Sequence, residues 1–338
     1  MKKKRMLLGI LLGMLLFTTA CGNSGGSEVS GEDKKDPIKI GFSALPSFYL
    51  WHLIEEKGFF EEKDVEVELV WFPVYSDSLA ALNTGKIDGN SQALLDTIAP
   101  LAEGIDLKTV FIMDNSNGGD GLVASDGITS IQDLKGKKIG TEIGTIAHFF
   151  MLTALNDVGL KESDIQFTNL SIADAGNAFL SGQLDAAGLW EPSLSKAVEK
   201  KGAHKLVSSA DYPGLISDVF VVRGEVANER KEEVEKITAA WFEGIEYLKN
   251  HYDESIEITA DAAEISTAEL DLGMQGFRLF TVDENQAAFK EGSSYESFYY
   301  TAEENAKFLK DLEFIDEIPD FSGFVDLSFI EKELEKNE

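Results

Sequence analysis

The fold can be read outward from one stretch of the chain, Ser181-Gly182-Gln183-Leu184-Asp185-Ala186-Ala187-Gly188-Leu189-Trp190-Glu191-Pro192. Glycine is common just after a helix because it adopts the left-handed backbone conformation without a Cβ penalty. The aspartate and the small residues after it suit a turn into a strand that is buried on both faces. Such a strand delivers Trp190 and Glu191 to the carboxyl edge of a sheet, where open α/β folds bind ligands.

The same pattern opens an earlier stretch, Thr84-Gly85-Lys86-Ile87-Asp88-Gly89. Further pairs match at nearly the same spacing, roughly 100 residues. These pairs are Gly41 with Gly140, Gly58 with Gly159, and Asp64 with Asp164. Each pair alone is compatible with ordinary turn chemistry. Together they predict a structural duplication, in which two similar α/β lobes face each other across a binding cleft.

The amino terminus has the pattern of a secretory signal. Four basic residues, Lys2 to Arg5, precede an apolar run from Met6 to Phe17, and Cys21 is the only cysteine. The run is too short for a comfortable membrane span. The segment resembles a bacterial lipobox, although Thr18 stands where leucine is usual. We expect a signal peptide at 1–20 and a lipidated Cys21, the alternative being an ordinary secretory signal with an incidental cysteine.

Composition predicts where the protein works and which partners it avoids. The formal net charge is −30, so nucleic acid and anionic membrane surfaces are unfavourable partners. Residues 21–37 are rich in Gly, Ser and charge and predict a flexible tether. The remainder is long enough for two lobes. We expect lobe 1 at 38–124 plus 223–338, lobe 2 at 125–222, and a monomer anchored by lipid to the outer face of the cytoplasmic membrane.

Candidate ligand residues in the first half follow predicted strands. Ser47 is a plausible N-cap for a helix from Phe48 to Lys57. Phe48 and Trp51 share one face of that helix, where they would line a ligand site or pack in the core. Further polar candidates lie at a predicted helix start after Gly89 and in a permissive loop at 114–121: Ser91, Gln92, Asp114, Asn117 and Asp120. Capping and turn formation are the structural alternatives for these polar residues.

The second half repeats these positions. A helix predicted from about Thr145 to Val158 offers backbone N–H groups at Gly144 and Thr145 that could hold an oxyanion. Trp190 and Glu191 could provide an aromatic plate and a fixed acceptor, or they could simply introduce the next helix. Asp218 opens a strand predicted to cross between the lobes. The chain then reads as amphipathic helices at 232–250, 268–279, 301–312 and 328–335.

The order of these motifs resembles one family, the solute-binding lipoproteins of ABC importers for nitrate, sulfonates, taurine and thiamine-pyrimidine precursors. The resemblance covers about residues 38–330. It rests on the lipobox-like start and on five segments: Ile40–Phe42, Ser116–Gly121, Asp133–Lys137, Gly182–Ala186 and Trp190–Pro192. It implies an α/β periplasmic-binding-protein fold of type II, with two crossover strands and a mixed sheet flanked by helices in each lobe. It also implies hinge closure on a small solute and partner permease and ATPase subunits.

The residues narrow the expected solute. The arginines Arg223, Arg230 and Arg278 lie outside the predicted ligand loops. The acidic candidates favour a group with N–H donors, so an anion would rest on helix N-termini instead. We therefore expect a sulfonate or taurine-like solute that carries an amine, or a solute similar to a thiamine-pyrimidine precursor.

An enzyme and a surface sensor are two alternatives to the importer. Relatives of this fold include a pyrimidine synthase rich in Cys and His. Here the four histidines show no paired metal-ligand spacing, and no phosphate loop or nucleophile elbow occurs. We therefore expect no enzyme activity, no metal and no cofactor. A surface sensor would use the same cleft, and the sequence does not separate it from an importer.

Overall fold

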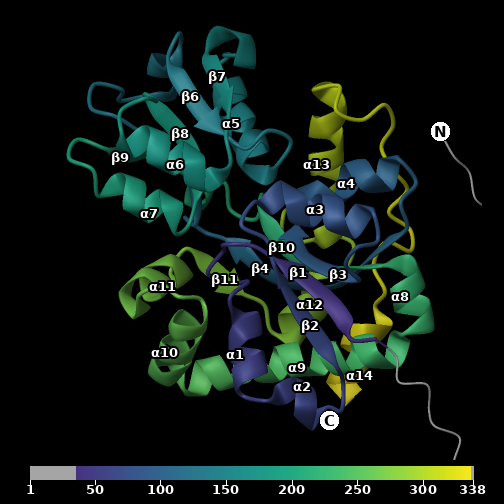
Figure 1. Cartoon of the computed structure of the whole chain (residues 1–338). Coiled ribbons are helices and arrows are strands. Elements are labelled where there is room, and N and C mark those ends of the chain that lie inside the picture. The colour runs from purple at the N-terminus through teal and green to yellow at the C-terminus, as the bar shows by residue number, and fades with distance from the viewer. Residues whose placement is uncertain (1–35, 336–338) are drawn as a thin grey trace, which may run out of the picture. The chain divides into compact units, whose positions relative to one another are not determined.

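Two mixed β-sheets carry the fold of residues 36–335, the part of the chain that the computed structural model describes (Figure 1). The first sheet runs in the order β11 (Phe277–Leu279), β4 (Leu107–Ser116), β10 (Ser217–Arg223), β3 (Gly89–Ala93), β1 (Ile38–Phe42) and β2 (Val67–Trp71). The second runs in the order β7 (Gln166–Asn169), β6 (Lys138–Thr141), β8 (Ala186–Trp190), β5 (Asp120–Ala124) and β9 (His204–Ser208).

Helices flank both sheets, as predicted. Figure 1 shows three of them gathered around the second sheet: α5 (Ile146–Asp157), α6 (Ile172–Leu180) and α7 (Ser193–Val198). The others pack on the first sheet or on one another: α1 (Leu50–Glu56), α2 (Phe59–Glu62), α3 (Tyr75–Asn83), α4 (Leu95–Ala102), α8 (Gly224–Glu229), α9 (Lys231–Asn250), α10 (Tyr252–Ala262), α11 (Thr267–Met274), α12 (Val282–Ala288), α13 (Phe298–Asp311) and α14 (Ser328–Glu335).

The two sheets repeat one topology. Strand β1 pairs in parallel with β2 and β3, and β6 pairs in parallel with β7 and β8. In each sheet an antiparallel strand, β10 or β5, then lies beside β3 or β8. The predicted duplication is therefore confirmed by the strand order.

The repeated Gly-x-x-Asp motif has one structural role in both sheets. Asp88 Oδ2 accepts a hydrogen bond of 2.9 Å from the Lys39 amide at the start of β1. Asp185 Oδ2 accepts the same bond, also 2.9 Å, from the Lys138 amide at the start of β6. The aspartate thus fixes the register between the strand that it introduces and the parallel strand beside it.

The glycines of the motif are required by backbone geometry. Gly85 and Gly182 have φ values of 72° and 79°, a region that costs other residues energy. The close approach of a neighbouring side chain explains a second pair of glycines. A Cβ on Gly41 would lie 2.4 Å from Ile87 Cδ1, and one on Gly140 would lie 2.6 Å from a Leu184 methyl group. The branched residue of each motif therefore packs on a glycine of the neighbouring strand.

The chain passes between the sheets twice. Strand β4 pairs in the first sheet and β5, the next strand along the chain, pairs in the second. The chain returns between β9 and β10. Residues 120–124 therefore pair in the second sheet and 217–222 in the first, whereas the predicted ranges assigned them the other way round. The boundaries of the lobes as moving units stay a prediction.

Three local predictions were wrong. Helix α1 begins at Leu50 after Tyr49, because the residues from Ser47 onward form tight turns instead of a cap. The polar residues after Gly89 form β3, which pairs on both edges, with β1 and β10, instead of starting a helix. The segment from Phe277 to Leu279 is a strand, because it pairs with the end of β4.

Large aromatic side chains fill the core beside the first sheet. Trp51 of α1 and Trp241 of α9 are both fully buried, with ring centroids 4.6 Å apart. Phe220 of β10 lies 5.2 Å from Trp51, and Phe111 of β4 stacks on Trp241 at 5.4 Å. Each such ring buries on the order of 150–250 Å², so this cluster is a main source of stability for the first sheet.

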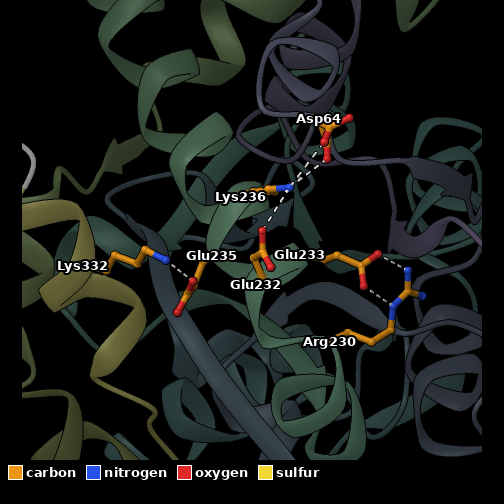
Figure 2. A network of polar contacts seen from close by, with 7 residues as sticks. All are labelled: Asp64, Arg230, Glu232, Glu233, Glu235, Lys236 and Lys332. Carbon is orange, nitrogen blue, oxygen red and sulfur yellow. Dashed lines mark hydrogen bonds and ion pairs between the residues drawn. The ribbon is translucent and has the colours of Figure 1, made fainter. Parts of the chain in front are cut away.

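Ion pairs connect α9 to its neighbours on the surface (Figure 2). Lys332 of α14 pairs with Glu235, and Lys236 lies between Asp64 and Glu232, 3.8 Å and 3.4 Å from their carboxylates. Exposed pairs of this kind contribute only about 0–1 kcal/mol each. They therefore add little to the stability that the apolar contacts of α9 provide.

The described residues contain no helix that is both long enough and apolar enough to cross a bilayer. The predicted signal peptide, the lipidation of Cys21 and nearly all of the tether fall on residues 1–35, outside the described residues. These expectations stay predictions.

We predict that Asp185→Ala lowers the free energy of unfolding by about 1.5–3 kcal/mol, because a charge-assisted hydrogen bond at the edge of β6 is lost. Chemical denaturation followed by circular dichroism measures the change. Asp316→Ala, which removes an exposed carboxylate from a loop, is the matched control and should have little effect. Equal stability of the two variants would contradict the role assigned to Asp185.

Candidate functional site

A small cavity lies where the edges of the two sheets meet. Its lining comes from the loop after β1, the first residue of α3, the start of β5, the first turn of α5, the end of β8 and the start of β10. The lining residues are Ser43, Ala44, Leu45, Phe48, Tyr75, Asp120, Ile146, Trp190, Ile216 and Asp218. The cavity volume is about 20 Å³, room for about one water molecule. It occupies the carboxyl edges of β1 and β8, where this class of sheet binds ligands.

Aromatic rings form the walls and connect the two sheets. Tyr75 and Trp190 meet edge to face with centroids 5.2 Å apart. The Trp190 indole N–H donates a hydrogen bond of 3.0 Å to the Ala44 carbonyl. Nearby, the Ser76 amide donates to Glu142 Oε1 at 2.9 Å. These contacts hold the cavity shut, so a solute larger than water enters only when they separate.

Carboxyl groups supply the polar part of the cavity. Asp120 and Asp218 line it and are only 3% and 4% exposed. Asp114, fully buried, stands directly opposite Asp218 on the neighbouring strand. Burial raises the pKa of Asp120 to about 7 and raises that of Asp218 well above its usual range. None of the lining residues is Lys, Arg, His or Cys, so no cation in the cavity wall offsets these charges.

Another buried carboxyl group, Asp96, adjoins this wall. Its Oδ2 accepts a hydrogen bond of 2.7 Å from the Tyr75 hydroxyl, which in turn accepts one of 2.9 Å from the Ala93 amide. The Ile146 amide at the N-terminus of α5 faces the same carboxyl. Burial raises the pKa of Asp96 to about 7, and these hydrogen bonds only partly oppose the rise. A protein carboxyl thus faces the helix end that was predicted to hold an anion.

The structure brings together four of the residues predicted for the site. Phe48, Asp120, Trp190 and Asp218 line the cavity, although they come from four different segments of the chain. Asp114 lies behind Asp218 and does not line the cavity. The arrangement combines flat apolar walls with hydrogen-bond acceptors, a combination that suits a planar group bearing N–H donors.

Three predicted residues belong to the core instead. The Trp51 indole N–H donates a hydrogen bond of 2.7 Å to Ser91 Oγ, and both residues are fully buried. Gln92 Oε1 accepts a hydrogen bond of 2.9 Å from the Asn90 side-chain amide. The expectation that Trp51 forms a ligand wall is therefore replaced by core packing, because its ring is enclosed by other aromatic rings and its N–H is satisfied.

The other predicted residues do not line this cavity either. Ser47 is fully buried near Asp114, and Asn117 is exposed. Glu191 accepts hydrogen bonds from the Ser195 amide and hydroxyl at 3.0 and 2.8 Å. It therefore caps the start of α7, the alternative role that the sequence offered for it. Gly144 and Thr145 line a separate, mostly apolar cavity of about 260 Å³ against α13.

Sequence reasoning missed Tyr75, Asp96 and Ile146 as neighbours of the site. Tyr75 stands at the start of α3, directly after the loop that follows β2, which is the kind of position that binds ligands in this fold. Asp96 carries no such signal, because an acidic residue in the first turn of a helix is ordinary. The described residues contain no group of three His, Cys, Asp or Glu side chains arranged to hold a metal ion.

Comparison with known proteins adds the family context. A family model described as NMT1/THI5 like matches residues 49–255. A Bacillus subtilis protein named for binding aliphatic sulfonates is 28% identical over 336 residues, 97% of this chain and 96% of that protein.

Solved structures share the fold. The periplasmic aliphatic sulphonate binding protein SsuA from Escherichia coli aligns with a TM-score of 0.69 at 21% identity, over 88% of this chain and 99% of that one. The desulfurization enzyme DSZB aligns with a TM-score of 0.64 at 16% identity, over 89% of this chain and 100% of that one. The predicted two-lobed periplasmic-binding-protein fold is confirmed.

We predict that Asp120→Asn becomes more stable than the wild type as pH rises. The raised pKa of Asp120 means that its protonated form stabilises the fold below about pH 4, and that this stability is lost as pH rises through about 7. The neutral amide has no such dependence. The difference in unfolding free energy should therefore be small at about pH 4 and grow to roughly 1–4 kcal/mol at about pH 8.

Urea denaturation at several pH values measures this difference, with Asp316→Asn as the control for a change of one surface charge. A constant difference between the Asp120 variant and the wild type across this pH range would show that Asp120 is ionised throughout.

Proposed function

Because the chain belongs to the NMT1/THI5-like family, we propose that it is the solute-binding component of an ABC importer and works outside the cytoplasmic membrane. The relatives named for sulfonate binding support a binding protein of this kind. Cys21 would carry the lipid that holds the protein at the membrane, and a permease and an ATPase from other chains would receive the solute. The same cleft could serve a surface sensor, whose partners would differ.

The solute class follows from one observation, the buried carboxyl groups of the cavity. Asp120 and Asp218 line the cavity with Asp114 directly behind, and none of the lining residues carries a positive charge. An anion placed there would meet uncompensated acceptors in a low-dielectric site, which is strongly unfavourable. We infer that the solute presents N–H donors, as an amino-substituted heterocycle or an amine does.

A bare sulfonate fits this cavity poorly. The N-terminus of α5, where a sulfonate would find backbone N–H groups, faces Asp96 instead. The three arginines of the described residues are engaged elsewhere, because Arg223 pairs with Glu225, Arg230 with Glu233 and Arg278 with Glu284. Of the two solutes expected from the sequence, the pyrimidine-like one is therefore favoured over the aliphatic sulfonate.

Binding must include separation of the two sheets. A volume of about 20 Å³ is far below the roughly 300–1,000 Å³ of sites for small organic molecules. The contacts that close the cavity are few and polar or edge to face, such as the hydrogen bond from Trp190 to Ala44. Such contacts can break and re-form around a solute, which agrees with a hinge mechanism.

Catalysis is not part of this proposal. DSZB shares the fold at an identity that carries no inference about activity. The cavity wall offers no Cys or His as a nucleophile or base, and the only cysteine of the chain is Cys21. The aspartates would act as hydrogen-bond acceptors for the bound solute.

We predict that aminopyrimidines or amidines such as benzamidine raise the melting temperature of the purified protein, and that methanesulfonate and sulfate do not. A ligand that binds only the folded state adds about 4 kcal/mol of stability at a thousandfold excess over its Kd. Asp218→Asn should abolish the shift without unfolding the protein, because it replaces a buried ionisable carboxyl that has no cationic partner in the cavity wall with a neutral amide.

Differential scanning fluorimetry followed by isothermal titration calorimetry provides the measurement. Asp316→Asn, an exposed and distant change, should bind like the wild type. Tight binding of sulfate or methanesulfonate, with no response to any nitrogenous compound, would overturn the proposed solute class.

A further inference from the structure

Two aspartates face each other across neighbouring strands beside the cavity. Asp114 of β4 and Asp218 of β10 are register partners in an antiparallel pair. Directly opposed side chains in such a pair are about 4.5–5.5 Å apart at their Cβ atoms, and like charges there repel. Both residues are buried, at 0% and 4% exposure, so water screens this repulsion poorly. Two carboxyl groups at these positions therefore cannot both be ionised unless a cation binds beside them; otherwise at least one of them holds a proton.

The elements packed around Asp114 and Asp218 place few basic side chains near this pair. The Ser47 hydroxyl and the Asp218 carboxyl oppose the desolvation of Asp114 only in part, so the pKa of Asp114 stays raised to about 7. The acidic and phenolic groups around the pair and its neighbours are Asp96, Asp120, Glu142, Glu191, Glu269 and Tyr75. Two basic residues of the described part of the chain act on outer members of this group: Lys205 acts on Glu191, and Lys196 lies 2.6 Å from Glu269 Oε1.

The geometry points to capture of a cationic solute by proton exchange: the Asp114–Asp218 pair and Asp120 hold protons in the unliganded protein and release them to water when the ammonium or amidinium group of the solute binds beside Asp218. This inference rests on the proposed function and deepens it, because it names a cation as the solute class. The exchange is balanced. A protonated carboxyl and a dissolved cation become a carboxylate–cation pair and a dissolved proton.

The electrostatics of the pair agree with this exchange. Burial raises the pKa of both Asp114 and Asp218, and the charge of Asp114 raises that of Asp218 further. A bound cation favours the ionised form, so the same groups have lower pKa values in the complex. Affinity therefore rises with pH between the lower and the higher pKa, by about tenfold per pH unit for each proton released. Below and above that window the affinity is constant.

Isothermal titration calorimetry with benzamidine tests the exchange. The titration is run at about pH 7 in phosphate and in Tris, whose ionisation enthalpies differ, so the difference in observed heat counts the protons released. We expect about one proton or more from the wild type and fewer from Asp114→Asn, with Asp316→Asn matching the wild type. Binding without release of protons would overturn the exchange and leave the proposed function standing.

A second measurement needs no ligand. Carboxyl ¹³C NMR of aspartate-labelled protein, with signals assigned through Asp114→Asn and Asp218→Asn, follows the titration of the pair directly. We expect at least one of the two carboxyls to stay protonated at about pH 6, and Asp218 to titrate at a lower pH in Asp114→Asn. Two carboxyls that both titrate near the ordinary aspartate pKa of about 4 would overturn the inference whatever the protein binds.

Discussion

Two equivalent hydrogen bonds, one in each sheet, set the strand geometry on which the rest of the protein depends. In each sheet an aspartate carboxylate, Asp88 or Asp185, accepts a hydrogen bond from an amide at the start of the neighbouring parallel strand. That bond fixes the strand register, and a one-residue slip would turn every side chain of a strand to the opposite face. Because β8 keeps its register, Trp190 reaches the cavity at its end, and because β1 keeps its register, the loop from Ser43 to Phe48 meets it there.

The site combines this geometry with an electrostatic imbalance. Buried carboxyl groups usually have a cationic partner or several donors, because desolvation of a charge is costly. Here the cavity wall provides neither for Asp120 and Asp218, and Asp114 adds a third acid directly behind. Such an arrangement lowers the stability of the ionised protein and gives a positively charged solute a large interaction to gain on binding. In the proposed function, this unfavourable placement of the acids would be the basis of selectivity between solutes of opposite charge.

Sequence patterns predicted several residues that line the cavity, but they did not predict which other residues surround them. Asp120, Trp190 and Asp218 stand beside turns or at strand ends, and the topology of an open α/β sheet gathers such positions at one edge. Trp51 could not be separated from Phe48 by helical spacing, because Phe48 lies in the turn before α1 and lines the cavity, whereas Trp51 lies in α1 and packs in the core. Asn90, Ser91 and Gln92 are polar and still lie in a strand buried on both faces, where they bond to one another and to core residues.

The sequence alone determined the fold class, the duplication and the family, since these depend on glycines, aspartates and apolar runs whose local conformational preferences act within a few residues. The sequence also determined the acidic character of the candidate residues. Only the tertiary structure decided that Asp114 opposes Asp218, that Asp96 faces the N-terminus of α5, and that Tyr75 closes the cavity against Trp190. These relations join segments far apart in the chain, and strand pairing and side-chain packing, which no local pattern encodes, fix their distances.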